Sequence, residues 1–158
     1  EKTHLGSGSF GPAEELLSVA DLPPGYAFTN IYYPAVSPDS EWIMFNASTG
    51  DSYDDPDASL FVVSIDGGTP IELVNANQSY SVANSLPKWA PATSGDEVWW
   101  FAFASRRNYG TNTAGNPQIW MSSFDPAEAT AGYDPSSTSI WMSNQNPSQN
   151  NHIPLWVP

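Results

Sequence analysis

The sequence predicts an all-β protein built from repeated four-stranded antiparallel meanders, and two observations support this prediction. Short runs rich in aromatic and β-branched residues lie between turns rich in Pro, Gly, Asn, Asp and Ser, which is typical of strands. These runs recur in a fixed order, which indicates a structural repeat. The composition agrees, because 13% of the residues are aromatic and only 13% are charged, unlike a charged disordered tail or a helical bundle.

Each copy of the repeat opens with a proline motif. The segment Tyr33-Pro34-Ala35-Val36-Ser37-Pro38 recurs at 86–91 as Leu-Pro-Lys-Trp-Ala-Pro and at 153–158 as Ile-Pro-Leu-Trp-Val-Pro. Further along, residues 42–47 match 100–105, and residues 60–66 match 119–125. The chain therefore contains two complete copies and the opening of a third.

The strands follow from these runs and from the turns between them. Pro38 and Asp39 favour a turn after the first run, and Gly67 and Gly68 tolerate the positive φ that a turn before the fourth run needs. Four strands per copy is the number found in a propeller blade. The predicted strands lie near 33–37, 42–46, 60–65 and 70–74 in the first copy, and near 86–90, 98–104, 118–124 and 139–142 in the second.

These strands predict a partial propeller. Residues 30–83 and 84–150 are two blades, and residues 151–158 are the first strand of a further blade. Residues 1–29 are a linker that could include the end of a preceding blade, since 13–22 fits a short helical turn or a last strand. Because a propeller ring has about four to eight blades, we expect the chain to be part of a longer protein. We also expect other polypeptide, either remaining blades or partner subunits, to cover its end faces, because the N-terminal stretch offers no evident cap.

The motifs resemble the TolB-like propellers built of PD40 repeats, which are relatives of WD40 blades. Residues 33–39 with 42–45, and the exit 60–66 followed by two glycines, carry the resemblance, which covers Tyr26 to Pro158. Residues 84–91, 103–110, 118–120 and 150–154 are similar to the closing blades of large exported bacterial proteins of this type. The resemblance implies a periplasmic, extracellular or cell-surface location. Ser40 departs from the family pattern, whose turn usually has Gly at this position.

One acidic loop is a candidate metal site. Asp51, Asp54, Asp55 and Asp57 lie within seven residues, and calcium prefers a shell of oxygen ligands. The loop lacks the glycine and the closing glutamate of an EF-hand, and the alternative is a solvated acidic turn. Calcium is the one cofactor that the sequence suggests.

Three basic or titratable residues are candidate binding residues. Arg106 and Arg107 are two of only four basic residues, and such a pair could bind an anion or carboxylate. The alternative is a structural role, in which they tie neighbouring loops together. His152, just before the third proline motif, is expected to form hydrogen bonds at a blade junction.

Several classes of function are disfavoured. A formal charge of −13 would repel a nucleic acid backbone. No apolar run approaches the length of a membrane span, and the chain has no cysteine for thiolate metal sites or disulfides. The sequence also lacks a Gly-x-Ser-x-Gly elbow and a His-Glu-x-x-His motif, so no catalytic residue is predicted.

The leading functional hypothesis is therefore a non-catalytic protein-interaction or scaffold module of an exported propeller protein. One alternative is an accessory segment of an enzyme, such as the propeller of a peptidase or a lyase. Another is a subunit of a large surface assembly whose acidic face contacts a basic partner. Propellers serve as scaffolds, receptors and enzymes, so the fold alone does not choose between these functions.

Overall fold

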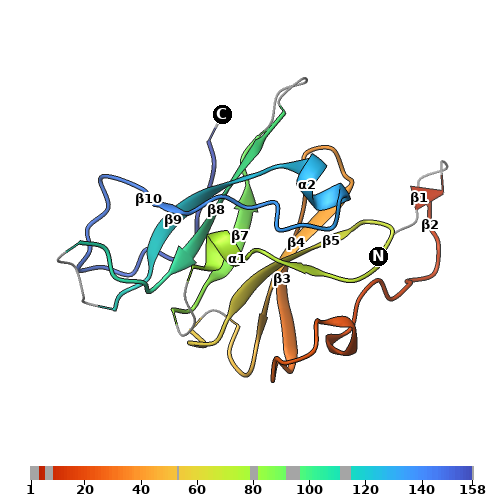
Figure 1. The fold of residues 1–158 in the computed structure, drawn as a ribbon, viewed down its shortest axis with the longest axis horizontal. Coiled ribbons are helices and arrows are strands. Elements are labelled where there is room, and N and C mark those ends of the chain that lie inside the picture. Colours follow the sequence, from red (N-terminus) through yellow and green to blue (C-terminus); the bar gives the residue numbers. More distant parts are fainter. Residues whose placement is uncertain are drawn as a thin grey trace.

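The computed structural model describes residues 4–5, 9–52, 54–78, 82–91, 97–110 and 115–157. Two four-stranded antiparallel sheets form most of the structure, and in each of them every strand pairs with the next along the chain (Figure 1). The first sheet contains β3 (Asn30–Val36), β4 (Trp42–Ser48), β5 (Ser59–Ser64) and β6 (Ile71–Glu72). The second contains β7 (Ser85–Trp89), β8 (Trp99–Ser105), β9 (Gln118–Phe124) and β10 (Ile140–Trp141). The predicted all-β class and the two meanders are confirmed, and the sheets do not close into a ring.

The remaining elements are short. A hairpin of β1 (His4–Leu5) and β2 (Ser9–Phe10) is followed by the 3₁₀ helix η1 (Val19–Asp21). A short helix, α1 (Val74–Asn77), follows the last strand of the first sheet, and another, α2 (Pro126–Thr130), follows the third strand of the second sheet. The α2 helix begins where the Asp125 carboxylate accepts the backbone N–H of Ala127 at 2.9 Å, with Pro126 in its first turn.

The predicted strand 70–74 extends too far toward the C-terminus, so its end is wrong. The run Pro70-Ile71-Glu72-Leu73-Val74 has strand-forming residues, but β6 ends at Glu72 and α1 begins at Val74. The backbone N–H of Leu73 still donates to Leu60 O at 3.0 Å, whereas Leu73 O accepts the N–H of Asn77 at 2.8 Å. Leu73 is therefore the residue at which strand pairing gives way to helical pairing.

The proline motif has the same backbone irregularity in both sheets. The pairing register shifts between Tyr32 and Ala35 in the first sheet, and between Ser85 and Lys88 in the second. At each shift the residue before proline has positive φ, 54° at Tyr33 and 56° at Leu86. Side chains of this size rarely adopt that conformation, so the surrounding structure must hold it. The turn residue Ser40 also has a φ of 66°, a conformation that glycine adopts at lower cost.

The main core lies between the two sheets. Met44, Leu60 and Val62 of the first sheet face the aromatic side of the second, and all three are fully buried. The second sheet contributes larger side chains to this core, namely Phe101, Phe103, Trp120 and Phe124. The strand β7 also contacts β3 and β4, so the first strands of the two meanders lie side by side (Figure 1).

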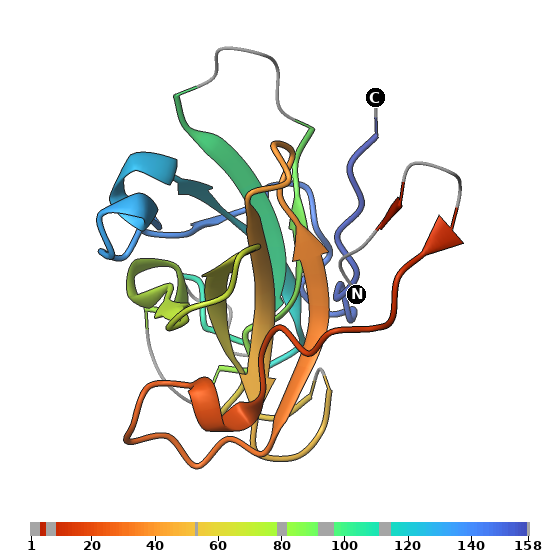
Figure 2. The ribbon, with the colours of Figure 1, turned by 90° about the vertical axis from the view of Figure 1, so that its right-hand side faces the viewer.

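The N-terminal segment covers the other face of the first sheet, and Figure 2 shows it crossing in front of that sheet. Leu22 joins Phe45, Phe61 and Val63 in a second core, with side chains from 16–28 packed around it. Tyr26 stacks on Phe28 with ring centroids 4.9 Å apart. The expectation that this stretch offers no cap is therefore wrong for the first sheet. Its apolar positions are too irregular to reveal the cover in the sequence.

Candidate protein-interaction site

The junction between the two sheets depends on Trp89, the tryptophan of the second proline motif. Its indole nitrogen donates to Ala35 O in β3 at 2.9 Å, while its ring meets Phe101 and Phe124 edge to face. The backbone N–H of Leu86 lies 3.4 Å from Asn46 Oδ1 of β4. The first strand of the second sheet, β7, is thus held to the first sheet by side-chain contacts and not by strand pairing.

Arg107 is a second connection between the sheets, and its guanidinium is buried. Its Nε donates to Ser105 Oγ at 2.9 Å, and Nη1 donates to Gln78 Oε1 at 2.7 Å. Its Nη2 lies within hydrogen-bond distance of Asn84 Oδ1 at 2.6 Å and of two carbonyl oxygens of α1, those of Ala76 at 2.9 Å and Asn77 at 3.2 Å.

The aromatic core surrounds the same guanidinium. Its central carbon lies 4.8 Å from the ring centroid of Trp120 and 5.2 Å from that of Phe103. Burial lowers the pKa of Arg107 to about 10, which leaves the group charged at neutral pH. The structure supports the structural role for Arg107, because its guanidinium donates hydrogen bonds to groups of the chain itself. Its partners on 76–84 could not be found from the sequence.

The loop 134–139 of the second repeat holds α1 from the opposite side. The Asp134 carboxylate accepts the backbone N–H of Asn75 at 2.7 Å, and Ser136 Oγ accepts that of Ala76 at 3.0 Å. Ser139 Oγ donates to Ala76 O at 2.9 Å. No motif in the sequence predicted that this stretch fixes the end of one repeat to the other.

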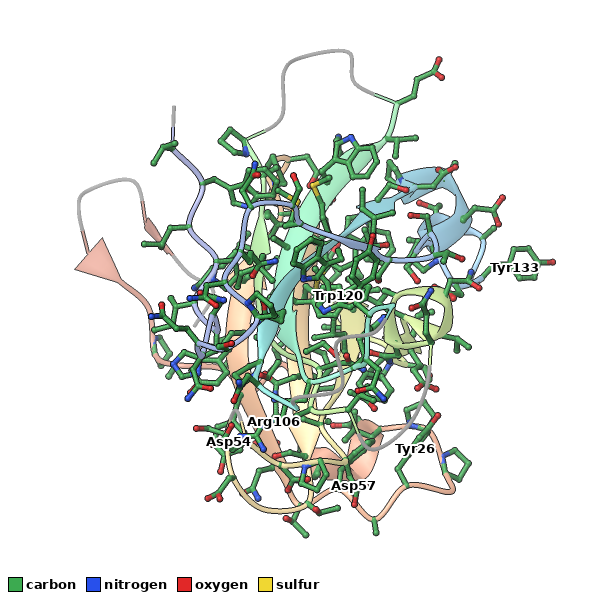
Figure 3. All side chains as sticks on the ribbon, turned by 90° about the vertical axis from the view of Figure 1, so that its left-hand side faces the viewer. Tyr26, Asp54, Asp57, Arg106, Trp120 and Tyr133 are labelled. Atoms are coloured by element: carbon green, nitrogen blue, oxygen red, sulfur yellow. The ribbon has the colours of Figure 1, made fainter. Side chains whose placement is uncertain are left out.

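Arg106 pairs with one of the predicted calcium ligands. Its Nη2 lies 2.6 Å from Asp54 Oδ1, and the two side chains are about equally exposed, at 39% and 40%. Figure 3 shows this pair at the same end of the molecule as Asp57, with Trp120 in the interior. The pair ties the acidic loop to the end of β8, a contact of the kind expected from the structural alternative, and anion binding by Arg106 stays a prediction.

The rest of the acidic loop is organised by its own backbone and hydroxyl groups. Asp55 is buried, and its carboxylate accepts the N–H of Asp57 at 2.8 Å and the hydroxyl of Thr49 at 2.8 Å. Asp51 is exposed. Within the described residues no group of three or more acidic or histidine side chains is placed to hold a metal ion. Calcium binding by this loop stays a prediction.

His152 begins the C-terminal segment 152–157 and is half-buried. Its neighbour Asn151 donates its backbone N–H to Pro117 O at 2.8 Å and its side-chain amide to Gln118 Oε1 at 3.3 Å, so the segment is anchored beside β9. Residues 151–157 form no strand in the structure. The prediction that they open a further blade is not tested by this observation.

The contact of the C-terminal segment with the second sheet repeats the junction between the sheets. The Trp156 indole nitrogen donates to Lys88 O at 3.1 Å, as that of Trp89 donates to Ala35 O at 2.9 Å. Lys88 follows Pro87 as Ala35 follows Pro34, so equivalent positions make the two bonds. The segment therefore contacts β7 as β7 contacts β3 (Figure 1).

The candidate interaction site is the face of the second sheet that points away from the first, together with this segment. We call it the outward face, and its strand residues include Lys88, Trp100, Ala102, Ala104, Ile119, Met121, Ser123 and Ile140. The side chains of Trp100 and Ile140 are 44% and 51% exposed. Exposed apolar side chains gathered on one face are typical of an interaction surface.

No protein-family model, curated protein or solved structure matches this chain. In the part of the chain that the structure describes, the helices are all too short to cross a membrane, as the sequence predicted.

Proposed function

We propose that the chain is a non-catalytic scaffold that binds other polypeptides, and that its two sheets are consecutive blades of a TolB-like, PD40-repeat propeller. The observation that carries this proposal is the repeated junction, in which Trp89 bonds to Ala35 O and Trp156 to Lys88 O. A side-chain contact that recurs at equivalent positions supports an array of like units, each stacked on its neighbour.

Several polar side chains form hydrogen bonds or ion pairs within the chain, which supports a structural role for them. Arg107 donates to acceptors of both repeats, and Arg106 pairs with Asp54. Asp55 is occupied by its own loop. These side chains thus bond within the scaffold, whereas Trp100 and Ile140 on the outward face are apolar and exposed.

The proposed location is the periplasm or the outer surface of the cell, and the proposed partners are other polypeptides. The low number of basic residues, four against seventeen acidic ones, supports a partner other than nucleic acid.

Site-directed photo-crosslinking in the cells that make the protein tests this function. A benzophenone amino acid replaces Ile140 on the outward face, and in a control variant it replaces exposed Ala127 on α2. We expect a discrete adduct with another polypeptide from position 140 and a much weaker one from position 127. Cell fractionation of the adduct should place it outside the cytoplasm. Absence of any adduct at position 140, or an adduct confined to the cytoplasm, would contradict the proposal.

A further inference from the structure

A groove lies at one end of the junction between the two sheets, where β4 begins and β5 ends. Its two adjoining hollows, of about 450 and 430 Å³, share Trp42, Ser64 and Ala129. The turns on either side of β4 and β5 line it from the first repeat, and α2 lines it from the second. We call it the Trp42 groove.

Trp42 is the large apolar side chain of this groove, and its position is fixed. Its backbone N–H donates to Ser37 Oγ at 2.9 Å, and its carbonyl accepts the N–H of Ser37 at 2.8 Å. Its half-buried ring meets that of Phe124 edge to face at 5.9 Å. Within the described residues no acceptor bonds to its indole N–H, unlike those of Trp89 and Trp156. A fixed aromatic ring with an unused donor thus borders the groove.

Carboxylates line the open side of the same groove. Asp39 and Glu41 both contribute to it, and both are exposed. Asp39 Oδ1 accepts the hydroxyl of Ser37 and, at 3.0 Å, the backbone N–H of Glu41, so the turn orients this carboxylate. The side chain of Glu41 has no partner among the described residues. None of the described basic residues lines the groove, so its negative charge is not balanced from within the chain.

An arginine side chain has the chemistry that matches both features. A guanidinium is planar, stacks on an indole ring and forms paired hydrogen bonds with a carboxylate. The chain already contains a contact of this kind, because the central carbon of the Arg107 guanidinium lies 4.8 Å from the ring centroid of Trp120. An anionic ligand would instead be repelled by Asp39 and Glu41.

We propose that the Trp42 groove binds an arginine side chain from a basic segment of a partner polypeptide, with the guanidinium over the Trp42 ring and paired with Glu41 or Asp39. This inference rests on the proposed scaffold function and names the chemistry of one partner. The net charge of −13 supports it, since an acidic chain attracts a basic segment over a distance. A second copy of the chain fits less well, because its two arginines already bond to its own groups.

A synthetic peptide tests the inference. The probe is a capped glycine–serine peptide with one arginine, and the control peptide has citrulline, which keeps the shape without the charge. NMR follows the indole N–H signals of the 158-residue chain during each titration. The arginine peptide should shift the signal of Trp42 and leave that of exposed Trp100 in place. The citrulline peptide should bind about tenfold or more weakly, because it forms no charged pair.

A matched pair of variants separates the groove from the overall charge. Glu41→Gln should weaken binding of the arginine peptide about two- to fivefold, as expected for an exposed ion pair. Asp51→Asn removes the same charge from another exposed carboxylate, but in the acidic loop beyond the other end of β4, and should leave binding unchanged. Figure 3 shows that loop, labelled at Asp54 and Asp57, at the end of the molecule away from α2. Both variants leave the core side chains in place.

An unshifted Trp42 signal, or equal binding of the citrulline peptide, would overturn the inference. Equal weakening by Glu41→Gln and Asp51→Asn would also overturn it, because the peptide would then respond to net charge and not to the groove. A Trp42 signal that moves with protein concentration in the absence of peptide would assign the groove to a second copy. Failed titrations together with a crosslink at position 140 in cells would refute this site and leave the scaffold function standing.

Discussion

The indole nitrogen of Trp156 lies 3.1 Å from the carbonyl oxygen of Lys88. Trp89 makes the same contact with Ala35 O at 2.9 Å, one repeat earlier. The two tryptophans hold different parts of the structure, however. Trp89 joins two complete sheets across the main core, whereas Trp156 holds a single extended segment against β7.

Trp89→Phe should destabilise the whole protein. The substitution removes the indole N–H that Ala35 O accepts and part of a ring that packs against Phe101 and Phe124. Loss of one partner from such a hydrogen bond costs about 1–3 kcal/mol. Urea denaturation followed by tryptophan fluorescence measures the free energy of unfolding.

Trp156→Phe is the matched comparison at the equivalent position. It should change the global free energy of unfolding by less than about 1 kcal/mol, because release of the C-terminal segment is a local opening. Faster amide exchange in 152–157 should accompany it. Equal global losses in the two variants would show that the segment is as integral to the fold as β7.

Arg107→Met should be among the most destabilising single substitutions. It leaves Gln78 Oε1 and Asn84 Oδ1 without the guanidinium that now donates to them, and it leaves Ala76 O with the Ser139 hydroxyl as its donor. Loss of the donor to a buried neutral acceptor such as Asn84 Oδ1 costs about 1–3 kcal/mol, and the substitution removes several such bonds. Thermal unfolding by circular dichroism gives the stability change.

Arg107→Lys separates charge from hydrogen-bond geometry. Lysine keeps the positive charge but lacks the planar fork that reaches acceptors in both repeats. We expect its stability to lie between those of the wild type and Arg107→Met. Wild-type stability for Arg107→Met would mean that the guanidinium does not connect the repeats.

The Arg106–Asp54 pair should contribute little. Because both side chains are more than a third exposed, a double-mutant cycle with Arg106→Ala and Asp54→Ala should give a coupling energy below about 1 kcal/mol. The coupling should shrink further in about 1 M salt, where screening is strong. Urea titrations of the four proteins supply the cycle, and a salt-independent coupling of several kcal/mol would contradict this assignment.

The N-terminal cover should loosen in acid. Asp21 accepts the backbone N–H and the hydroxyl of Ser18, both at 2.8 Å, and these bonds lower the pKa of its carboxyl below the usual 3.8. A carboxyl with a lowered folded pKa adds stability above its unfolded pKa, and this contribution is lost as the pH falls through the folded value.

An NMR titration of the Ser18 amide should therefore show a midpoint below pH 3.8, and Asp21→Asn should abolish that transition. A midpoint at or above the usual value would show that the capping contact does not form in solution.

The sequence predicted the strands well because their signals are local. Aromatic and β-branched runs between Pro and Gly turns located all eight strands of the two sheets, within a few residues. The third proline motif identifies Trp156 as the equivalent of Trp89, but the sequence predicted that Trp156 faces solvent, whereas its indole nitrogen donates to Lys88 O. Leu73 and Val74 misled the prediction, because strand-forming residues there enter a helical turn that Arg107 and the loop 134–139 hold from outside.

The contacts between distant segments could not be predicted in this way. Residues 16–28 cover the first sheet without a periodic pattern in the sequence. The residues that accept hydrogen bonds from Arg107 also lack such a pattern. Both depend on how the sheets stack. The outward face shares this limit, because the stacking of the sheets decides that Leu60 and Val62 are buried while Ile119 and Met121 are partly exposed.

The repeated junction is tested most directly by hydrogen exchange of the indole N–H groups, resolved by NMR in the 158-residue chain. We expect the Trp89 and Trp156 indole protons both to exchange slowly, since each is bonded to a carbonyl at the same repeat position. The indole of Trp100, on the outward face, should exchange fast. A Trp156 indole proton that exchanges as fast as that of Trp100 would show that the junction is not repeated in solution.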